Sequence, residues 1–139
     1  MDELYQSQIL ALARAVRTSS TIAHPTHHAT LRNTSCGDEI HLDLHIKNNQ
    51  ICDIHIAVSG CALCEAGAGL LYQQALSSKV ADISRLSDDF TAFLGARADN
   101  GGDAAVRLFS PFTPLREVRN RHKCATLAFN AFHKAIAQK

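Results

Sequence analysis

The sequence predicts an α+β domain in which a small antiparallel sheet is covered by helices. Two runs near the middle of the chain alternate apolar and polar residues with a period of two, which is typical of strands with one buried face. The segments before and after them carry apolar residues at three- and four-residue spacing, which indicates amphipathic helices. A helix, a hairpin and several more helices, in that order, favour helices packed against one sheet face.

The chain of 139 residues suits a single domain spanning 1–139. Its 46% hydrophobic and 19% charged residues are ordinary for a globular protein. The net charge is +1, from fourteen basic and thirteen acidic side chains, so there is no basic excess of the kind that binds nucleic acid or an anionic membrane. No apolar run approaches the length that crosses a bilayer.

The N-terminal residues are acidic and lead into an amphipathic pattern, whereas a secretory signal begins with basic residues and a continuous apolar run. We therefore expect a cytoplasmic protein, in which thiols stay reduced. Five cysteines in that setting are more typical of ligands, nucleophiles or buried residues than of a disulfide framework, and the odd count agrees.

The elements follow in order. An N-terminal helix is expected within residues 1–17, where apolar residues form a helical stripe. Residues 18–35 are rich in Ser, Thr and His and predict an irregular connection, with a weak third strand near 29–35. The hairpin pairs 40–47 with 52–58, and its apolar face comprises Ile40, Leu42, Leu44, Ile46, Cys52, Ile54, Ile56 and Val58.

The turn of this hairpin is Asn48-Asn49, and its polar face carries His41, His45 and His55, which are expected in solvent, as are His24, His27 and His28. Helices are then expected over 62–78 and 82–94. A polar insertion loop follows at 95–103. Short helix or turns are predicted over 104–119, and a terminal helix begins near Arg121.

Three cysteines fall at element boundaries instead of inside apolar stripes. Cys36 precedes the first hairpin strand, while Cys61 and Cys124 each open a helix. Loops and helix N-termini expose functional groups on a rigid frame, and the positive end of a helix dipole favours the thiolate. Gly37 lets Cys36 and Asp38 turn toward one point.

Cys36, Asp38, Cys61 and Cys124 could together form a tetrahedral site with three thiolates and one carboxylate. Thiolates select zinc and iron–sulfur clusters, and a single harder carboxylate makes a site easier to exchange. Two simpler interpretations compete with this one: small cysteines often fill core gaps, and Asp is a common turn residue.

Three short segments resemble the IscU/NifU-type scaffolds of iron–sulfur cluster assembly. Residues 34–38 (Thr-Ser-Cys-Gly-Asp) are similar to the family's Cys-Gly-Asp motif, and residues 59–62 (Ser-Gly-Cys-Ala) to its Gly-Cys step between strand and helix. Residues 121–127 (Arg-His-Lys-Cys-Ala-Thr-Leu) are similar to the third-cysteine motif. The resemblance covers roughly residues 30–139. It implies an IscU/SufU-like fold, a zinc ion or transient [2Fe–2S] cluster on Cys36, Asp38, Cys61 and Cys124, and a cysteine desulfurase as sulfur donor.

Within this family the chain looks closest to the SufU-like branch. Lys123 stands where IscU proteins have His before the third cysteine, and the segment between Cys61 and Cys124 looks longer than in IscU. The Leu-Pro-Pro-Val-Lys chaperone segment is absent before Cys124. The family's Asn-Pro-Arg-Asn segment is also not recognisable in residues 25–33.

Other residues near these motifs admit two interpretations each. Cys64 completes a Cys-x-x-Cys with Cys61 but is favoured as a semi-buried helix residue over an auxiliary thiol. Lys123 is favoured as a cation that steadies neighbouring thiolates, and Arg121 could share that role or dock a partner. His122 is a weaker ligand candidate.

Three functions therefore follow. The first is an assembly scaffold on which Cys124 or a neighbour such as Cys61 accepts sulfur from a SufS/IscS-type desulfurase, and the cluster passes to apo iron–sulfur proteins. The second is a zinc-dependent sulfurtransferase that relays persulfide sulfur without holding a cluster. A purely structural zinc domain ranks last, because closed structural sites rarely include Asp. The sequence leaves open whether the protein counts as an enzyme and whether it dimerises.

Overall fold

A computed structural model describes residues 3–95 and 104–137 of the chain. Within them, no helix has the length and apolar character needed to cross a membrane. The helices and 3₁₀ segments are α1 (Glu3–Val16), α2 (Ala62–Ala75), α3 (Val80–Gly95), α4 (Ala104–Phe109), η1 (Ser110–Glu117), η2 (Arg119–Arg121) and α5 (His122–Ile136). The strands are β1 (His27–Asn33), β2 (Asp38–Lys47) and β3 (Gln50–Ser59). Apart from Gly95, the expected loop at 95–103 lies outside the described residues.

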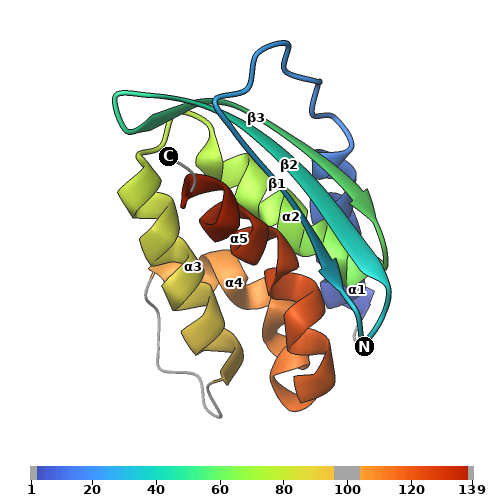
Figure 1. Cartoon of the computed structure of the whole chain (residues 1–139). Helices are drawn as coiled ribbons and strands as arrows, with labels where there is room; N and C mark the ends of the chain where they lie inside the picture. Colours follow the sequence, from blue (N-terminus) through green and yellow to red (C-terminus); the bar gives the residue numbers. More distant parts are fainter. Residues whose placement is uncertain (1–2, 96–103, 138–139) are drawn as a thin grey trace.

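The three strands form one antiparallel sheet in the order β1-β2-β3 (Figure 1). The predicted hairpin is confirmed, with Asn48 and Asn49 at its turn, where both residues have positive φ angles of 54° and 62°. Two consecutive residues in the left-handed region are the signature of the tight turn whose twist matches a hairpin, and Asn tolerates it. The weak third strand also exists, and it begins at His27, two residues earlier than expected.

Cys52 does not lie on the buried face of the hairpin, and that expectation was wrong. The register slips between His45 and Ile46: His45 pairs with Asp53, whereas Ile46 pairs with Ile51. A bulge of this kind sets an extra residue against the partner strand and reverses the alternation beyond it. Ile51 therefore enters the core, and Cys52 is exposed.

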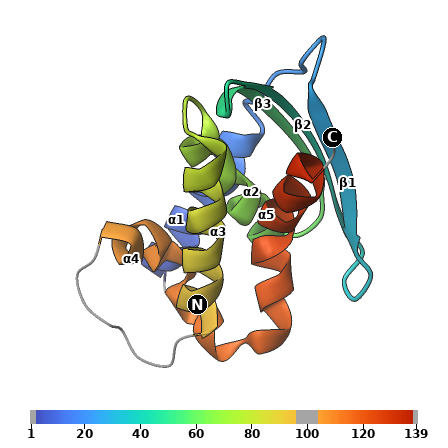
Figure 2. The ribbon, with the colours of Figure 1, turned by 60° about the vertical axis from the view of Figure 1, so that its left-hand side comes forward.

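The helices lie on one side of the sheet, which Figure 2 shows nearly edge-on. Helices α2 and α5 pack directly on the sheet, and α1 packs along α2. Behind them, the ring of Phe90 on α3 gathers aromatic side chains from three other segments. Its centroid lies 5.1 Å from Phe109, 4.9 Å from Phe112 and 5.5 Å from Phe129. These offset and edge contacts join α3, α4, η1 and α5 into one core.

The N-terminal helix docks on its own domain. A Cβ atom added at Gly69 of α2 would lie 1.8 Å from the carbonyl oxygen of Leu12, so only glycine allows α1 to approach this closely. Beyond the end of α1, Arg17 donates two hydrogen bonds to Glu65 of α2, at 2.8 and 2.9 Å. Because the predicted site residue Cys61 directly precedes α2, the packing of α1 on α2 also helps to position the site.

Replacing Gly69 by Ala should lower the free energy of unfolding by about 2 kcal/mol or more, because the methyl group must push two helix backbones apart. Urea unfolding followed by circular dichroism measures the change. Gly95→Ala is the matched control, since nothing lies within 4 Å of its added Cβ, and it should stay within about 1 kcal/mol of the parent. Equal stability of the two variants would contradict the close packing of α1 on α2.

Candidate metal and thiol site

The four predicted ligands come from three separate places in the fold. Cys36 lies in the turn that joins β1 to β2, and Asp38 is the first residue of β2. Cys61 is the N-cap of α2, and Cys124 lies in the first turn of α5. Gly37, with a φ of 77°, accepts the left-handed conformation that the β1–β2 turn requires. The backbone N–H groups of Cys36 and Gly37 both donate to the carbonyl of Asn33, which closes this turn.

These side chains meet at one end of the sheet. The Sγ atoms of Cys36 and Cys124 are 3.7 Å apart, although 88 positions separate them in the chain. The Cys36 thiol donates to Asp38 Oδ2 at 2.9 Å, and the Cys61 thiol donates to the same oxygen at 3.5 Å. One atom each from Cys36, Asp38 and Cys124 lie within 4.8 Å of one another. Cys61 is not in that tightest group and joins the site through Asp38.

Asp38 connects the start of β2 to the start of α2. Its Oδ1 accepts the backbone N–H of Cys61 at 3.0 Å, a helix-start donor that would otherwise lack a partner. Gly60 makes room for this contact, because a Cβ there would lie 2.5 Å from the same oxygen. The carboxylate is thus held by backbone geometry while its second oxygen faces the thiols.

The pKa values of Asp38 and Cys124 shift in opposite directions, although both groups are buried. Burial alone would raise the pKa of Asp38, but hydrogen bonds from the Cys36 thiol, the Cys61 N–H, and the Cys61 and Cys124 thiols outweigh it and lower that pKa. The pKa of Cys124 is raised to about 12, mainly by burial and then by the neighbouring Cys36. The site therefore favours the charged carboxylate of Asp38 and the neutral thiol of Cys124.

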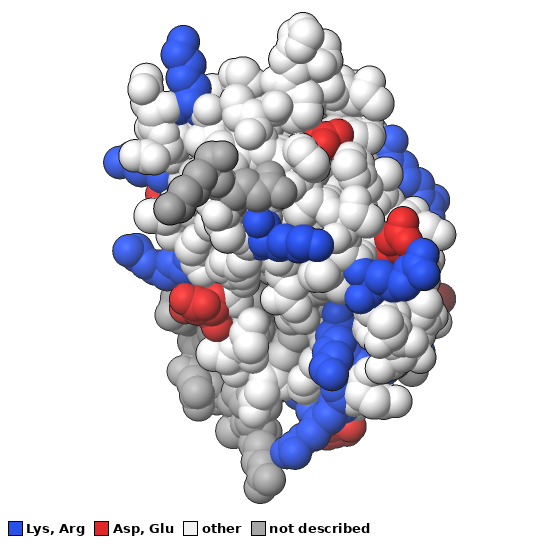
Figure 3. Space-filling model, in the orientation of Figure 1, with Lys and Arg blue, Asp and Glu red and all other residues white. Residues whose placement is uncertain are grey.

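Cationic side chains flank the thiols. The pKa of the Arg121 guanidinium is raised by the nearby Cys61 and Cys124, and Arg121 lines the same cavity as Cys36 and Cys124. Its Nε atom is buried without a hydrogen-bond partner. A cavity of about 360 Å³ opens beside Cys36 and Cys124, and exposed Lys123 lines it together with Arg121 and Arg119. On the face shown in Figure 3, basic side chains gather over the region where α5 begins.

Three further residues lie close to the four predicted ligands. Asn33 is 9% exposed and its amide lies 4.0 Å from the Cys124 sulfur; the sequence patterns gave no sign of it. His122 donates its Nε2 proton to the carbonyl of Leu115 at 2.6 Å, so that nitrogen is not a ligand. Cys64 is fully buried, and burial, followed by the charges of Asp38 and the site thiols, raises its pKa.

The donor set fits a thiophilic cation. Zinc–sulfur bonds of 2.3 Å at a tetrahedral angle put two sulfurs about 3.8 Å apart, and a sulfur and an oxygen about 3.5 Å apart. The Cys36–Cys124 separation of 3.7 Å and the Cys61–Asp38 separation of 3.5 Å match these edges. The Cys36–Asp38 contact of 2.9 Å is a hydrogen bond, and it would lengthen when both groups bind one ion. The guanidinium of Arg121, whose buried Nε has no hydrogen-bond partner, supplies a positive charge that would compensate the negative charge of thiolates.

Comparison with known proteins places this chain in a family. Residues 4–138 match the family described as the NifU-like N terminal domain, so the chain belongs to it. The protein is 23% identical over 133 residues to the iron–sulfur cluster assembly scaffold protein IscU of Thermotoga maritima, covering 96% of this chain and 92% of that protein. It is 26% identical over 120 residues to the IscU of Streptococcus pyogenes serotype M1, covering 81% and 75% of the two chains.

Solved structures agree on the fold. The N-terminal part of a nitrogen-fixing NifU-like protein from Brucella abortus superposes with a TM-score of 0.81 at 24% identity, covering 99% of this chain and 94% of that one. A protein from Fervidobacterium islandicum, described as a scaffold for the SUF system, gives 0.75 at 19% identity, covering 97% and 95%. The predicted α+β fold and the IscU/NifU resemblance are both confirmed.

The thiols should differ in reactivity when no metal is present. Under a chelator at neutral pH, iodoacetamide should modify exposed Cys36 and Cys52 first, and buried Cys64 and Cys124 last, because only an accessible thiolate reacts. Mass spectrometry of tryptic peptides over time gives the order. In urea all five cysteines should react at similar rates. Modification of folded Cys124 as fast as Cys52 would contradict the burial described here.

Proposed function

We propose that the protein works in iron–sulfur cluster assembly, accepting sulfur from a SufS/IscS-type cysteine desulfurase and building a cluster on Cys36, Asp38, Cys61 and Cys124. The observation that carries this proposal is the meeting of those four side chains, from three segments, at one end of the sheet. Membership of the NifU-like family and the assembly-scaffold names of two relatives support the same role. Apo iron–sulfur proteins are the recipients of the finished cluster.

Sulfur acceptance is a thiol–persulfide exchange. The thiolate of Cys124 attacks the outer sulfur of the donor's persulfide, the donor's S–S bond breaks, and its cysteine leaves as a thiolate. The product is a persulfide on Cys124, so no oxidant or reductant is needed. Because burial disfavours the Cys124 thiolate, a neighbouring positive charge must help to form it. Arg121, against both Cys61 and Cys124, is in place to do so, and Lys123 adds charge at the cavity mouth.

A second candidate is a zinc-dependent sulfurtransferase of the SufU-like kind, favoured by the compactness of the donor set. One atom each of Cys36, Asp38 and Cys124 lie within 4.8 Å of one another, and the Cys36–Cys124 separation of 3.7 Å fits two sulfurs on one tetrahedral ion. Zinc bound there would keep thiolates deprotonated but protected until one of them leaves to accept sulfur.

Metal analysis of the protein as isolated, followed by anaerobic reconstitution with iron and sulfide, separates the two functions. A stable chromophore that transfers to an apo-ferredoxin supports the assembly scaffold. One zinc per chain, no stable chromophore and faster desulfurase turnover support the sulfurtransferase. Failure of both, with no response of any desulfurase to the protein, would rule out the proposed role.

Cys124→Ser should abolish sulfur acceptance, because the hydroxyl cannot form a persulfide. The measurement is transfer of ³⁵S from cysteine through a desulfurase, read on non-reducing gels, with persulfide-specific labelling to locate the sulfur. Cys52→Ser, on the exposed bulge of β3, is the matched control and should accept sulfur normally. Unchanged acceptance by the Cys124 variant would rule out its assigned role.

Asp38→Ala should slow the release of metal or cluster, since the carboxylate is the weakest ligand of the set. Transfer to a chelator, followed by absorbance, gives the rate. Asp38→Asn is the control, because its carbonyl oxygen can still accept the Cys61 N–H that Asp38 binds at 3.0 Å. Faster loss from the alanine variant than from the wild-type protein would contradict the role of Asp38 as the weakest ligand.

A further inference from the structure

The outer face of the sheet, which points away from the helices, carries an unusual concentration of imidazoles. Along β2, His41, Asp43 and His45 alternate with the buried leucines. The register places Asp43 directly opposite His28 of β1 and His55 of β3, so one carboxylate has a histidine beside it on both neighbouring strands. Side chains that face each other across a sheet have Cβ atoms about 5 Å apart.

We propose that His41, Asp43 and His55 form a second metal site, separate from the thiol site, for a divalent ion of borderline hardness such as zinc. Imidazole and carboxylate ligands suit this class of ion. Asp43 lies five positions after Asp38 on the same strand, and an odd offset puts the two carboxylates on opposite faces of the sheet. The two sites therefore do not share ligands.

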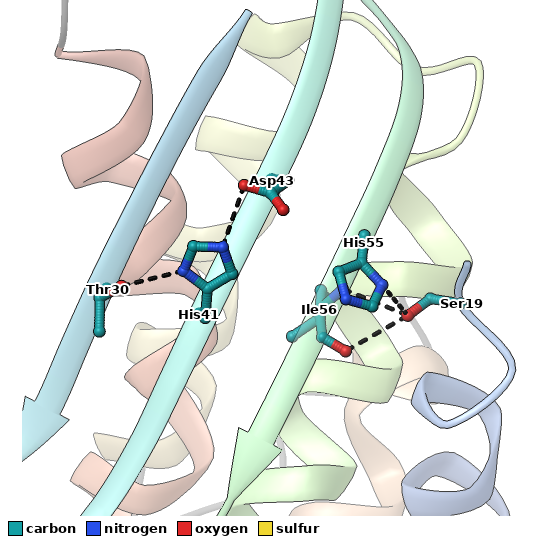
Figure 4. Close-up of polar contacts among 6 residues, drawn as sticks. All are labelled: Ser19, Thr30, His41, Asp43, His55 and Ile56. Atoms are coloured by element: carbon teal, nitrogen blue, oxygen red, sulfur yellow. Dashed lines mark hydrogen bonds and ion pairs between the residues drawn. The ribbon is translucent and has the colours of Figure 1, made fainter. Parts of the chain in front are cut away.

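Two of the three proposed ligands, His41 and Asp43, already contact each other (Figure 4). His41 Nε2 and Asp43 Oδ1 are 3.1 Å apart, a separation typical of two ligands on one ion. On the other side of the ring, His41 Nδ1 contacts the hydroxyl of Thr30 at 2.9 Å. A hydroxyl both donates and accepts, so the Thr30 oxygen can accept a hydrogen bond from Nδ1–H when Nε2 turns its lone pair to a metal, which is the usual support for a ligating histidine.

The hydrogen bonds of Ser19 determine the proton position on His55. The Ser19 hydroxyl donates its single proton in a hydrogen bond of 3.2 Å to the carbonyl of Ile56, because a carbonyl can only accept. The same oxygen accepts the N–H of Ile56 at 3.2 Å and also contacts His55 Nδ1 at 3.1 Å. Nδ1 must then carry the proton, which leaves the lone pair of a neutral ring on Nε2, as a metal ligand requires.

The three ligands of the proposed outer site are not yet gathered around one point in the structure. Within the described residues, the ligand atoms that lie within 4.8 Å of one another are those of Cys36, Asp38 and Cys124, and the outer-face histidines are not among them. His41 is 43% exposed at its side chain and Asp43 17%, so an ion reaches the pair from solvent. The His55 ring lies against Ser19 in the structure and has to leave that contact to turn toward Asp43. We therefore expect micromolar affinity, weaker than at the thiol site.

Equilibrium dialysis against micromolar free zinc tests the proposal on the full chain, with the thiol site loaded first. The wild-type protein should take up a second equivalent of zinc. The double variant His41→Gln, His55→Gln should keep the first equivalent and lose the second. Thr30→Val should weaken the second binding about tenfold, since it removes only the support of the His41 ring.

His27→Gln is the matched control. The ring of His27 contacts Thr26, and His27 pairs across the sheet with buried Leu44, which places it on the inner face, away from the proposed ligands. It should retain both equivalents. Histidine ring NMR signals of the wild-type protein give a test without substitutions: His41 and His55 should shift with the second equivalent, and His122 and His133 should not. The absence of a second equivalent, or its persistence in the double variant, would overturn the proposal.

Discussion

The buried carboxylate of Asp38 is the contact on which the site depends. One of its oxygens accepts the first backbone N–H of α2, from Cys61, and the other accepts the Cys36 and Cys61 thiols. It therefore fixes the start of a strand, the start of a helix and two sulfurs relative to one another. Its hydrogen bonds lower its pKa, so they stabilise the folded state above the unfolded pKa, and that stabilisation is lost as pH falls through the folded value.

Much of the fold could be predicted because its strongest signals are local. The alternation of Ile40, Leu42 and Leu44 with polar residues identifies a strand by itself, and Asn48-Asn49 supplies the turn. Cys52 could not be placed in this way. The bulge opposite His45 and Ile46 depends on how two strands pair, and a pattern of apolar and polar letters within one strand contains no such information.

The site could be predicted only as a set of residues. Motifs singled out Cys36, Cys61 and Cys124, but their meeting depends on contacts across as many as 88 positions. The same limit hid Asn33, a strand residue whose amide reaches the Cys124 sulfur only after β1 and α5 pack together. For the cations, the sequence favoured Lys123 as a charge near the thiolates and left the role of Arg121 open; in the structure both residues line the cavity beside Cys36 and Cys124, and Lys123 is the exposed one.

Burial and ligand chemistry together distinguish the thiol site from the outer face of the sheet. At the thiol site, burial opposes the thiolates that a soft cation requires, so the site holds its charge as a carboxylate until a cation or Arg121 stabilises sulfur anions. On the outer face, the imidazoles of His41 and His55, the ligands proposed for the second site, remain in contact with solvent, where binding an ion would cost less desolvation. The sheet separates these donor sets because successive side chains of β2 point to opposite faces, and ligand softness would then direct each ion to the face that suits it.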